Sequence, residues 1–136
     1  MDEHRKKDYI IIADDDSDDQ LFIKDALQRK SFAGSFECVE NGIMLLDYLR
    51  IPPVKLPRLI LLDLNMPFKN GYQTLEELKS DGQLRNIPVF VLTSSLSESD
   101  EQKCYKLGCN NFYRKPNSVP EYDALADELV RYLKAS

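Results

Sequence analysis

Five short apolar segments recur along the chain, and between them the apolar residues are spaced as on one face of a helix. The segments are residues 9–13, 35–40, 59–62, 89–92 and 112–114. The first, third and fourth are continuous apolar runs, which is typical of strands covered on both faces. Strands that alternate with helices in this way predict an α/β domain with a parallel sheet between two layers of helices.

Each stretch between the strands predicts a helix with one buried face. The residues expected on these faces are, in chain order, Phe22, Ile23, Ala26 and Leu27; Ile43, Leu46 and Leu49; Tyr72, Leu75 and Leu78; and Tyr122, Leu125, Leu129, Tyr132 and Leu133. Ser17 and Gln20 are expected to form a capping box for the first helix, and Asn41 is a suitable cap for the second. A helix over residues 98–107 is expected to end at Gly108 in the left-handed conformation.

Length and composition are those of one globular domain. The chain has 136 residues, of which 43% are hydrophobic and 30% charged. We therefore expect one domain spanning residues 1–136, with its core over about residues 8–135 and no attached effector domain. The net charge of −5 disfavours a nucleic-acid partner, because a phosphate backbone is bound by basic surfaces.

The chain carries no sign of a membrane or secreted protein. No apolar run approaches the roughly 20 residues that a membrane-spanning helix needs, and the polar residues 1–8 do not resemble a signal peptide. A cytoplasmic protein is therefore expected. The three cysteines, Cys38, Cys104 and Cys109, have no CxxC spacing, so neither a zinc site nor a disulfide framework is indicated. We interpret them as buried or half-buried small side chains.

Polar residues follow four of the five predicted strands at the point where each strand ends. They are Asp14, Asp15 and Asp16 after the first strand, Asp63 after the third, Thr93 after the fourth and Lys115 after the fifth. In an open parallel sheet, ligands bind beyond the carboxyl ends of the strands. These side chains are therefore expected to form one site.

The chemical types of these side chains indicate metal-assisted phosphoryl transfer. Neighbouring carboxylates cannot all stay ionised without a counter-charge, and Mg²⁺ prefers carboxylates, waters and phosphate oxygens as ligands. A further carboxylate can act as a nucleophile and form an aspartyl phosphate. A hydroxyl and a lysine ammonium can neutralise the oxygens of the transferring group.

Four stretches at these positions resemble the receiver domain of two-component response regulators. They are residues 10–16 (IIIADDD), residues 61–67 (LLDLNMP) with Gly71, residues 89–94 (VFVLTS), and Gly108 followed by Phe112 and Lys115-Pro116. The resemblance covers nearly the whole chain, and each motif lies at its expected strand end in the expected order. It implies a flavodoxin-like (βα)5 fold with five parallel strands in the order 2-1-3-4-5.

The resemblance also implies a role for each acidic residue. Asp63 is implied as the phosphoacceptor and as a metal ligand. Asp15 is implied as a direct ligand of Mg²⁺, Asp14 as a second acid that holds the metal through water, and Asn65 as the donor of a backbone carbonyl. The run of aspartates leaves a second register open. The family's acidic pair follows the strand immediately, which favours Asp14 and Asp15, with Asp16 beginning the turn into the helix.

The remaining motif residues are implied to sense the phosphoryl group. Thr93 and Lys115 would contact its oxygens, with Ser94 in the small-residue position after the threonine. Phe112 stands where the family has an aromatic residue, often tyrosine, that turns inward on activation. Phenylalanine lacks the hydroxyl that an outward hydrogen bond of the inactive state would need. Taken alone, Phe112 is equally well interpreted as an ordinary core aromatic with no switching role. Thr93 and Phe112 are the expected switch residues.

A protein of this family takes a phosphoryl group from a sensor histidine kinase and assists only its own phosphorylation and dephosphorylation, so an enzyme is not expected. The expected output is a downstream protein, a histidine phosphotransferase, or a reversible homodimer. The responding face would be that of the fourth helix, fifth strand and fifth helix. The segments LDLNMP and LTSS are similar to those of stand-alone regulators paired with bacterial phytochromes.

Two rival functions remain open from the sequence. Phosphatases of the haloacid-dehalogenase type carry two aspartates two residues apart after their first strand, as Asp14 and Asp16 are here. Two residues after the second aspartate these phosphatases usually have a threonine or valine, and this chain has Asp18 there. The second rival is a degenerate receiver that binds proteins and is never phosphorylated. The presence of every acceptor-site residue disfavours it.

Overall fold

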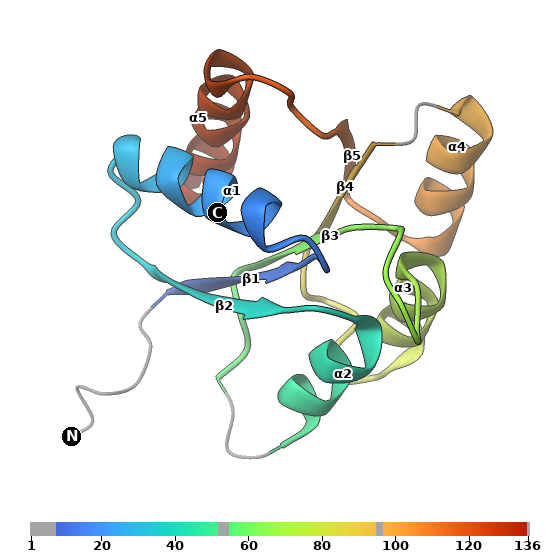
Figure 1. Ribbon diagram of the computed structural model, residues 1–136. Coiled ribbons are helices and arrows are strands. Elements are labelled where there is room, and N and C mark those ends of the chain that lie inside the picture. Colours follow the sequence, from blue (N-terminus) through green and yellow to red (C-terminus); the bar gives the residue numbers. More distant parts are fainter. Residues whose placement is uncertain (1–7, 52–54, 95–96, 136) are drawn as a thin grey trace.

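Five parallel strands form the sheet at the centre of the molecule in the computed structural model, which describes residues 8–51, 55–94 and 97–135 (Figure 1). The strands are β1 (Tyr9–Ala13), β2 (Ser35–Val39), β3 (Leu59–Leu62), β4 (Val89–Thr93) and β5 (Asn111–Arg114). The helices are α1 (Ser17–Arg29), α2 (Gly42–Arg50), α3 (Gly71–Ser80), α4 (Glu98–Leu107) and α5 (Val119–Ala135).

The strands lie in the order β2-β1-β3-β4-β5, and each neighbouring pair is parallel. Helices α1 and α5 cover one face of the sheet, and α2, α3 and α4 cover the other (Figure 1). The expected α/β fold and strand order are therefore confirmed. β2 lies on one side of β1, whereas β3, β4 and β5 follow on its other side. The strand order therefore reverses between β1 and β3, and the loops that follow these two strands diverge and leave room for a ligand.

A hydrophobic core lies on each side of the sheet. Alternate residues of β1 serve the two cores, with Ile11 on the side of α2, α3 and α4 and with Ile10 and Ile12 on the side of α1 and α5. All residues of β1, β3 and β4 are buried, whereas the edge strands β2 and β5 are mostly half-buried. The continuous apolar runs thus mark the strands that are covered on both faces, as expected.

The expected capping box of Ser17 and Gln20 is wrong. The N-cap of α1 is Asp16, whose carboxylate accepts hydrogen bonds from two backbone N–H groups of the first turn. A carboxylate suits this place because it also complements the positive end of the helix dipole. Gln20 instead donates its side-chain amide to the backbone carbonyls of Asp14 and Val39.

Two residues expected on buried helix faces are exposed. Phe22 and Ile43 each expose 46% of their surface. The residues that pack against the sheet are Ile23, Ala26 and Leu27 on α1 and Leu45, Leu46 and Leu49 on α2. Both helices contain consecutive apolar residues, so the spacing alone does not tell which side of each helix faces the sheet.

Other expectations about single elements are met within one residue. β2 ends one residue earlier than expected, β5 begins one residue earlier, and Thr93 belongs to β4. α4 ends at Gly108, which has a left-handed φ of 108°.

The three cysteines are free and are buried or half-buried. No helix within the described ranges combines the length and apolar character needed to cross a membrane.

Candidate functional site

Backbone hydrogen bonds continue one residue past the ends of three strands and fix the residues that follow. The N–H of Asp14 donates to the last residue of β2 at 3.0 Å, that of Asp63 to the last residue of β1 at 3.0 Å, and that of Lys115 to the last residue of β4 at 2.7 Å. The three side chains therefore project from a rigid backbone at one edge of the sheet.

Asp14, Asp15 and Asp63 form a cluster of carboxylates, which we call the acid cluster. One oxygen of each lies within 4.8 Å of the others. Asp14 and Asp63 are only 2% and 3% exposed, whereas Asp15 faces solvent. Carboxylates this close repel one another unless a cation compensates for their charge. An array of carboxylate oxygens that is open on one side suits a hard divalent cation.

The ammonium group of Lys115 lies among the carboxylates. Its Nζ atom is 2.7 Å from Asp19, 3.0 Å from Asp14 and 3.2 Å from Asp63. One ammonium faces these three carboxylates and the neighbouring Asp15, so the site keeps a net negative charge. That excess charge favours the entry of a divalent cation.

Burial governs the ionisation of the site. Loss of hydration raises the pKa of Asp14 to about 6, although hydrogen bonds from the Asp16 backbone and from Lys115 favour its ionised form. Burial also raises the pKa of Asp63, with Lys115 acting in the opposite direction. For Lys115, burial works to lower the pKa, but the carboxylates of Asp19 and Asp14 outweigh it and raise the pKa. The ammonium therefore stays protonated at neutral pH.

Each buried carboxylate is oriented by a backbone N–H two residues further along the chain. Asp16 donates to Oδ1 of Asp14 at 2.9 Å, and Asn65 donates to Oδ1 of Asp63 at 3.2 Å. The other oxygen of each carboxylate, Oδ2, contacts Lys115. Both side chains are thus held in one orientation. A carboxylate that is held in this way can attack a correctly placed phosphorus atom without first losing rotational freedom.

A glycine at position 71 allows α3 to begin directly beside the loop that carries Asp63. A Cβ atom on Gly71 would lie 2.5 Å from the carbonyl oxygen of Asp63 and 2.5 Å from the Cα of Leu64. The Gly71 N–H donates to the Leu64 carbonyl at 3.0 Å, and Asn70 and Gln73 form a capping box at the same helix start. Any side chain at position 71 would therefore force the backbone of Asp63 and Leu64 to shift.

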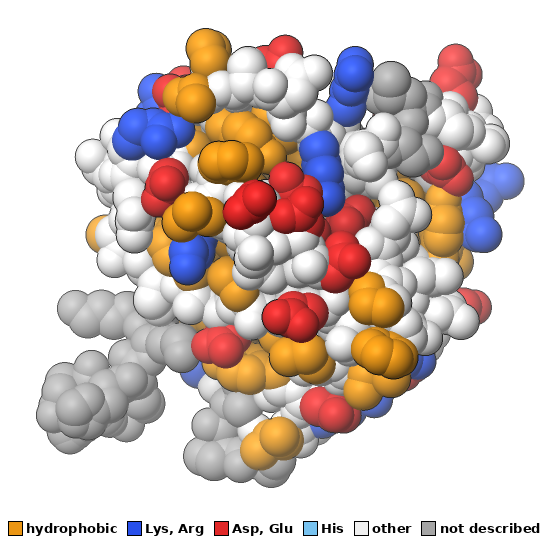
Figure 2. All heavy atoms as spheres, in the orientation of Figure 1, with side chains coloured by type: hydrophobic (Ala, Val, Ile, Leu, Met, Phe, Trp, Pro, Cys, Tyr) orange, Lys and Arg blue, Asp and Glu red, His pale blue; other side chains and the backbone are white. Residues whose placement is uncertain are grey.

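The acid cluster borders an open cavity of about 520 Å³. The lining residues are Asp15, Asp16, Asp19, Asp63, Asn65, Ser94, Arg114, Lys115, Pro116 and Asn117. Figure 2 shows acidic side chains gathered over the end of β1 and the start of α1, with basic side chains beside them. A donor molecule can therefore reach the carboxylates from solvent.

The two expected switch residues do not line the cavity. Thr93 is completely buried at the end of β4, whereas its neighbour Ser94 lines the cavity. Phe112 is half-buried and packs against the core on the side of α2, α3 and α4. Contact between Thr93 and a phosphoryl group would require a movement of β4 or of the Thr93 side chain.

Sequence reasoning missed Asp19, Arg114 and Asn117 as residues of the site. Asp19 lies in the first turn of α1, where the sequence indicates only a favourable interaction with the helix dipole. Its contact with Lys115 joins residues 96 positions apart. Arg114 and Asn117 flank Lys115 in the chain, and this closeness is the signal that could have found them.

Comparison with known proteins connects the chain with one family. A sequence model of the response regulator receiver domain matches residues 10–126. The probable methanogenesis regulatory protein FilR2 of Methanothrix harundinacea is 34% identical over 126 residues, which are 90% of this chain and 81% of that protein. The response regulator Rcp1 of Synechocystis sp. is 29% identical over 124 residues, which are 88% of this chain and 84% of Rcp1.

Solved structures agree with these sequence relationships. The phosphorylated cyanobacterial phytochrome response regulator RcpA superposes with a TM-score of 0.85 at 30% identity, over 93% of each chain. The Mn²⁺-bound form of Rcp1 superposes with a TM-score of 0.82 at 27% identity, over 90% of this chain and 91% of that one. The arrangement of β-strands and helices described above is therefore shared by proteins known in phosphorylated and in metal-bound forms.

Proposed function

Since this chain belongs to the response regulator receiver domain family, we propose that Asp63 is the residue on which a sensor histidine kinase phosphorylates it. Family membership makes the protein a response regulator of two-component signalling and not a classical enzyme. The observation that carries the choice of Asp63 is its position. Its carboxylate is buried at the end of the central strand β3, contacts Lys115, and belongs to the acid cluster.

Mg²⁺ is the cation proposed for the acid cluster. Asp15 lines the cavity and is exposed, which suits a direct ligand, whereas Asp14 is buried and does not line the cavity, which suits a contact through water. Asp63 would add a carboxylate oxygen, and Asn65 a backbone carbonyl. Bound Mg²⁺ supplies positive charge to the oxygens of the transferring phosphoryl group. The Mn²⁺-bound form of Rcp1 supports a divalent cation in this fold.

The proposed reaction is the transfer of one phosphoryl group between nitrogen and oxygen. An oxygen of the ionised Asp63 carboxylate attacks phosphorus, the phosphorus–nitrogen bond of the phosphohistidine breaks, and the imidazole leaves with the electron pair and takes up a proton. Lys115 assists because its ammonium favours the ionised form of Asp63, although burial still raises the pKa of this carboxyl, and because it lies where phosphoryl oxygens would come. Later attack by water on phosphorus returns the carboxylate and inorganic phosphate.

Mass spectrometry after incubation with acetyl phosphate and Mg²⁺ tests the assignment. Wild type is expected to carry one phosphoryl group that maps to Asp63, and Asp63→Asn is expected to carry none. Asp18→Asn is the matched control, because Asp18 is an exposed carboxylate on the first turn of α1 and its loss should leave labelling unchanged. Equal labelling of Asp63→Asn and wild type would refute the proposal.

The same experiment separates the two rivals. A phosphatase would turn over many donor molecules and keep no stable adduct, and a passive binding module would form no adduct at all. The structure disfavours the phosphatase. Such an enzyme would need Asp16 as its second catalytic acid, but the Asp16 carboxylate accepts backbone hydrogen bonds as the N-cap of α1. A stable adduct in wild type would exclude both rivals.

The proposed output is a change in the face formed by α4, β5 and α5. Thr93 lies two residues beyond Val91, and Val91 is the cross-strand partner of Phe112. Both side chains therefore belong to the same side of the sheet. Movement of Thr93 towards a phosphoryl group would open space that Phe112 can fill, and the altered face would bind a downstream protein, a histidine phosphotransferase or a second copy of the chain.

The setting proposed for this exchange is the cytoplasm, where a histidine kinase is charged from ATP. Residues 8–135 would act there as one receiver domain. The likeness to RcpA supports a kinase of the phytochrome type as the donor. Comparing the rates at which purified histidine kinases of different sensor types transfer their phosphoryl group to Asp63 would test this choice, and a non-phytochrome kinase that transfers faster would overturn it.

A further inference from the structure

Lys115 has three carboxylate partners, and they come from different parts of the site. Asp14 and Asp63 belong to the acid cluster. Asp19 lies on the first turn of α1, outside the acid cluster. The contact between Lys115 and Asp19 is the shortest of the three at 2.7 Å. A cation in the acid cluster would attract Asp14 and Asp63. Among the carboxylate partners of Lys115 in the described residues, only Asp19 would then remain paired with the ammonium alone.

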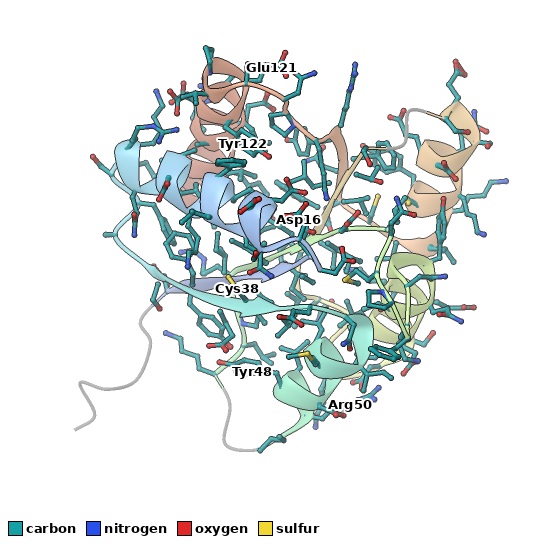
Figure 3. All side chains as sticks on the ribbon, viewed as in Figure 1. Asp16, Cys38, Tyr48, Arg50, Glu121 and Tyr122 are labelled. Carbon is teal, nitrogen blue, oxygen red and sulfur yellow. The ribbon has the colours of Figure 1, made fainter. Side chains whose placement is uncertain are left out.

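Asp19 lies close to the start of α5. It lines a surface pocket together with Tyr122, and Tyr122 is buried between α5 and α1 (Figure 3). The Tyr122 ring packs against that of Phe22 on α1, with ring centroids 5.5 Å apart. The Asp19 carboxylate is half-buried beside Lys115 and therefore has less freedom to rotate than a fully exposed aspartate.

Without Asp19, the ammonium and a divalent cation would compete for the same oxygens. The remaining partners of Lys115, the Oδ2 atoms of Asp14 and Asp63, are 3.0 Å and 3.2 Å from Nζ. A cation that enters the acid cluster attracts both carboxylates, Asp63 directly and Asp14 through water, and its positive charge repels the ammonium, so both ion pairs are weakened. A buried ammonium that loses its partners is strongly destabilised. A third carboxylate outside the acid cluster removes this penalty.

We propose that Asp19 is a positioning residue that holds the Lys115 ammonium beside the acid cluster when a divalent cation occupies it. The inference rests on the proposed function, since it takes the acid cluster as the cation site. Asp19 would increase the affinity for the cation by keeping Lys115 paired in the cation-bound state, and it would keep the ammonium within reach of the phosphoryl oxygens. It would touch neither the phosphoryl group nor the cation.

Cation affinity measures this role without any phosphoryl donor. Mn²⁺ binding is followed by the electron paramagnetic resonance of the free ion, and Mg²⁺ binding by competition with Mn²⁺. Asp19→Asn is expected to raise the Kd about threefold to tenfold, because Lys115 then depends on Asp14 and Asp63 alone. Asp18→Asn removes the same charge one residue away and is expected to change the Kd less than twofold. Equal effects of the two substitutions would overturn the proposal.

A second comparison separates the effect through Lys115 from the direct effect of one lost charge. In a Lys115→Met background the ammonium no longer competes, so the factor by which Asp19→Asn raises the Kd is expected to fall at least threefold. The same factor with and without Lys115 would contradict a positioning role. Asp19→Glu keeps the charge and should stay within about threefold of wild-type affinity; an affinity as weak as that of Asp19→Asn would also contradict the proposal. Circular dichroism verifies that each variant is folded.

The kinetics of phosphorylation give an independent readout. With acetyl phosphate, Asp19→Asn is expected to raise the Mg²⁺ concentration for half-maximal rate by about the same threefold to tenfold as the Kd. A loss of maximal rate with no change in the Mg²⁺ requirement would refute the inference. If wild type is never phosphorylated, the proposed function fails, and the cation titrations still decide the role of Asp19.

Discussion

At the scale of single residues, the site depends on carboxylates that the fold buries at a cost in stability. Asp14 illustrates the sign of this effect. Burial raises its pKa from 3.8 to about 6, so the folded protein binds the Asp14 proton more tightly than the unfolded chain does. Between about pH 4 and pH 6 the contribution of Asp14 to the free energy of unfolding therefore falls as the pH rises. The proposed cation site would account for a carboxyl group at this position despite the cost of burying it.

The neutral substitution Asp14→Asn is expected to stabilise the metal-free protein, and to do so more at high pH. From the shift in pKa, the gain in the free energy of unfolding over wild type should be about 2 kcal/mol larger at pH 7.5 than at pH 4.5. Urea unfolding of both proteins in the presence of EDTA at the two pH values measures the difference. A gain that does not change with pH would show that Asp14 is not the buried acid described here.

At the scale of elements, the position of α4 is tied to α3 through a glycine and a lysine. Gly108 ends α4 with φ 108°, and a Cβ atom there would lie 2.9 Å from Cγ of Lys79. Lys79 cannot swing away freely, because its ammonium donates to the backbone carbonyls of Arg85 and Ile87 in the connection to β4. The start of β4, the end of α3 and the end of α4 are therefore fitted together at one place.

Gly108→Ala is expected to lower the free energy of unfolding by about 1–3 kcal/mol, because a side chain at this φ is strained and also presses on Lys79. Gly82→Ala is the matched control, since a Cβ at Gly82 meets no atom within 4 Å, and it should change stability by less than about 1 kcal/mol. Chemical denaturation of the three proteins gives both values. Similar losses in the two variants would contradict the role assigned to the conformation of Gly108.

At the scale of the whole molecule, a signal must pass from the acid cluster to a surface that another protein can bind. Phosphorylation can shift the population of two packing arrangements only by its differential contacts, which amount to a few kcal/mol. In the proposed switch, the buried Thr93 and the half-buried Phe112 would make such a two-state change, with Phe112 taking the space that Thr93 leaves. The exposed Tyr105 on α4 would lie in the responding face.

Addition of beryllofluoride, which mimics the phosphoryl group on Asp63, is expected to produce a reversible dimer in sedimentation experiments and to change amide exchange over residues 97–115. Phe112→Ala should abolish both effects. Phe32→Ala is the control, because Phe32 is also half-buried but packs on the opposite side of the sheet, and it should leave both effects intact. Identical association and exchange in all samples would rule out a switch through this face.

Local sequence patterns determined the kind and position of almost every element of this protein, and the polar residues that follow each strand. Continuous apolar runs mark β1, β3 and β4 because a strand that is covered on both faces has no place for polar residues. The candidates Asp14, Asp63 and Lys115 follow from the same pattern, since parallel strands bring their carboxyl ends to one edge. The strand order came from the family resemblance and not from the pattern.

Only the tertiary structure decided which residues meet across elements. The exposure of Phe22 and Ile43 depends on how α1 and α2 rotate against the sheet, and consecutive apolar residues leave that rotation open. The burial of Thr93 depends on what covers β4. The approach of Asp19 to Lys115 spans 96 positions in the chain. It arises because α1 packs beside α5 and the Lys115 side chain, which follows β5, reaches the first turn of α1. Local patterns specify the faces and ends of elements, whereas contacts of this kind depend on how those elements are packed in space.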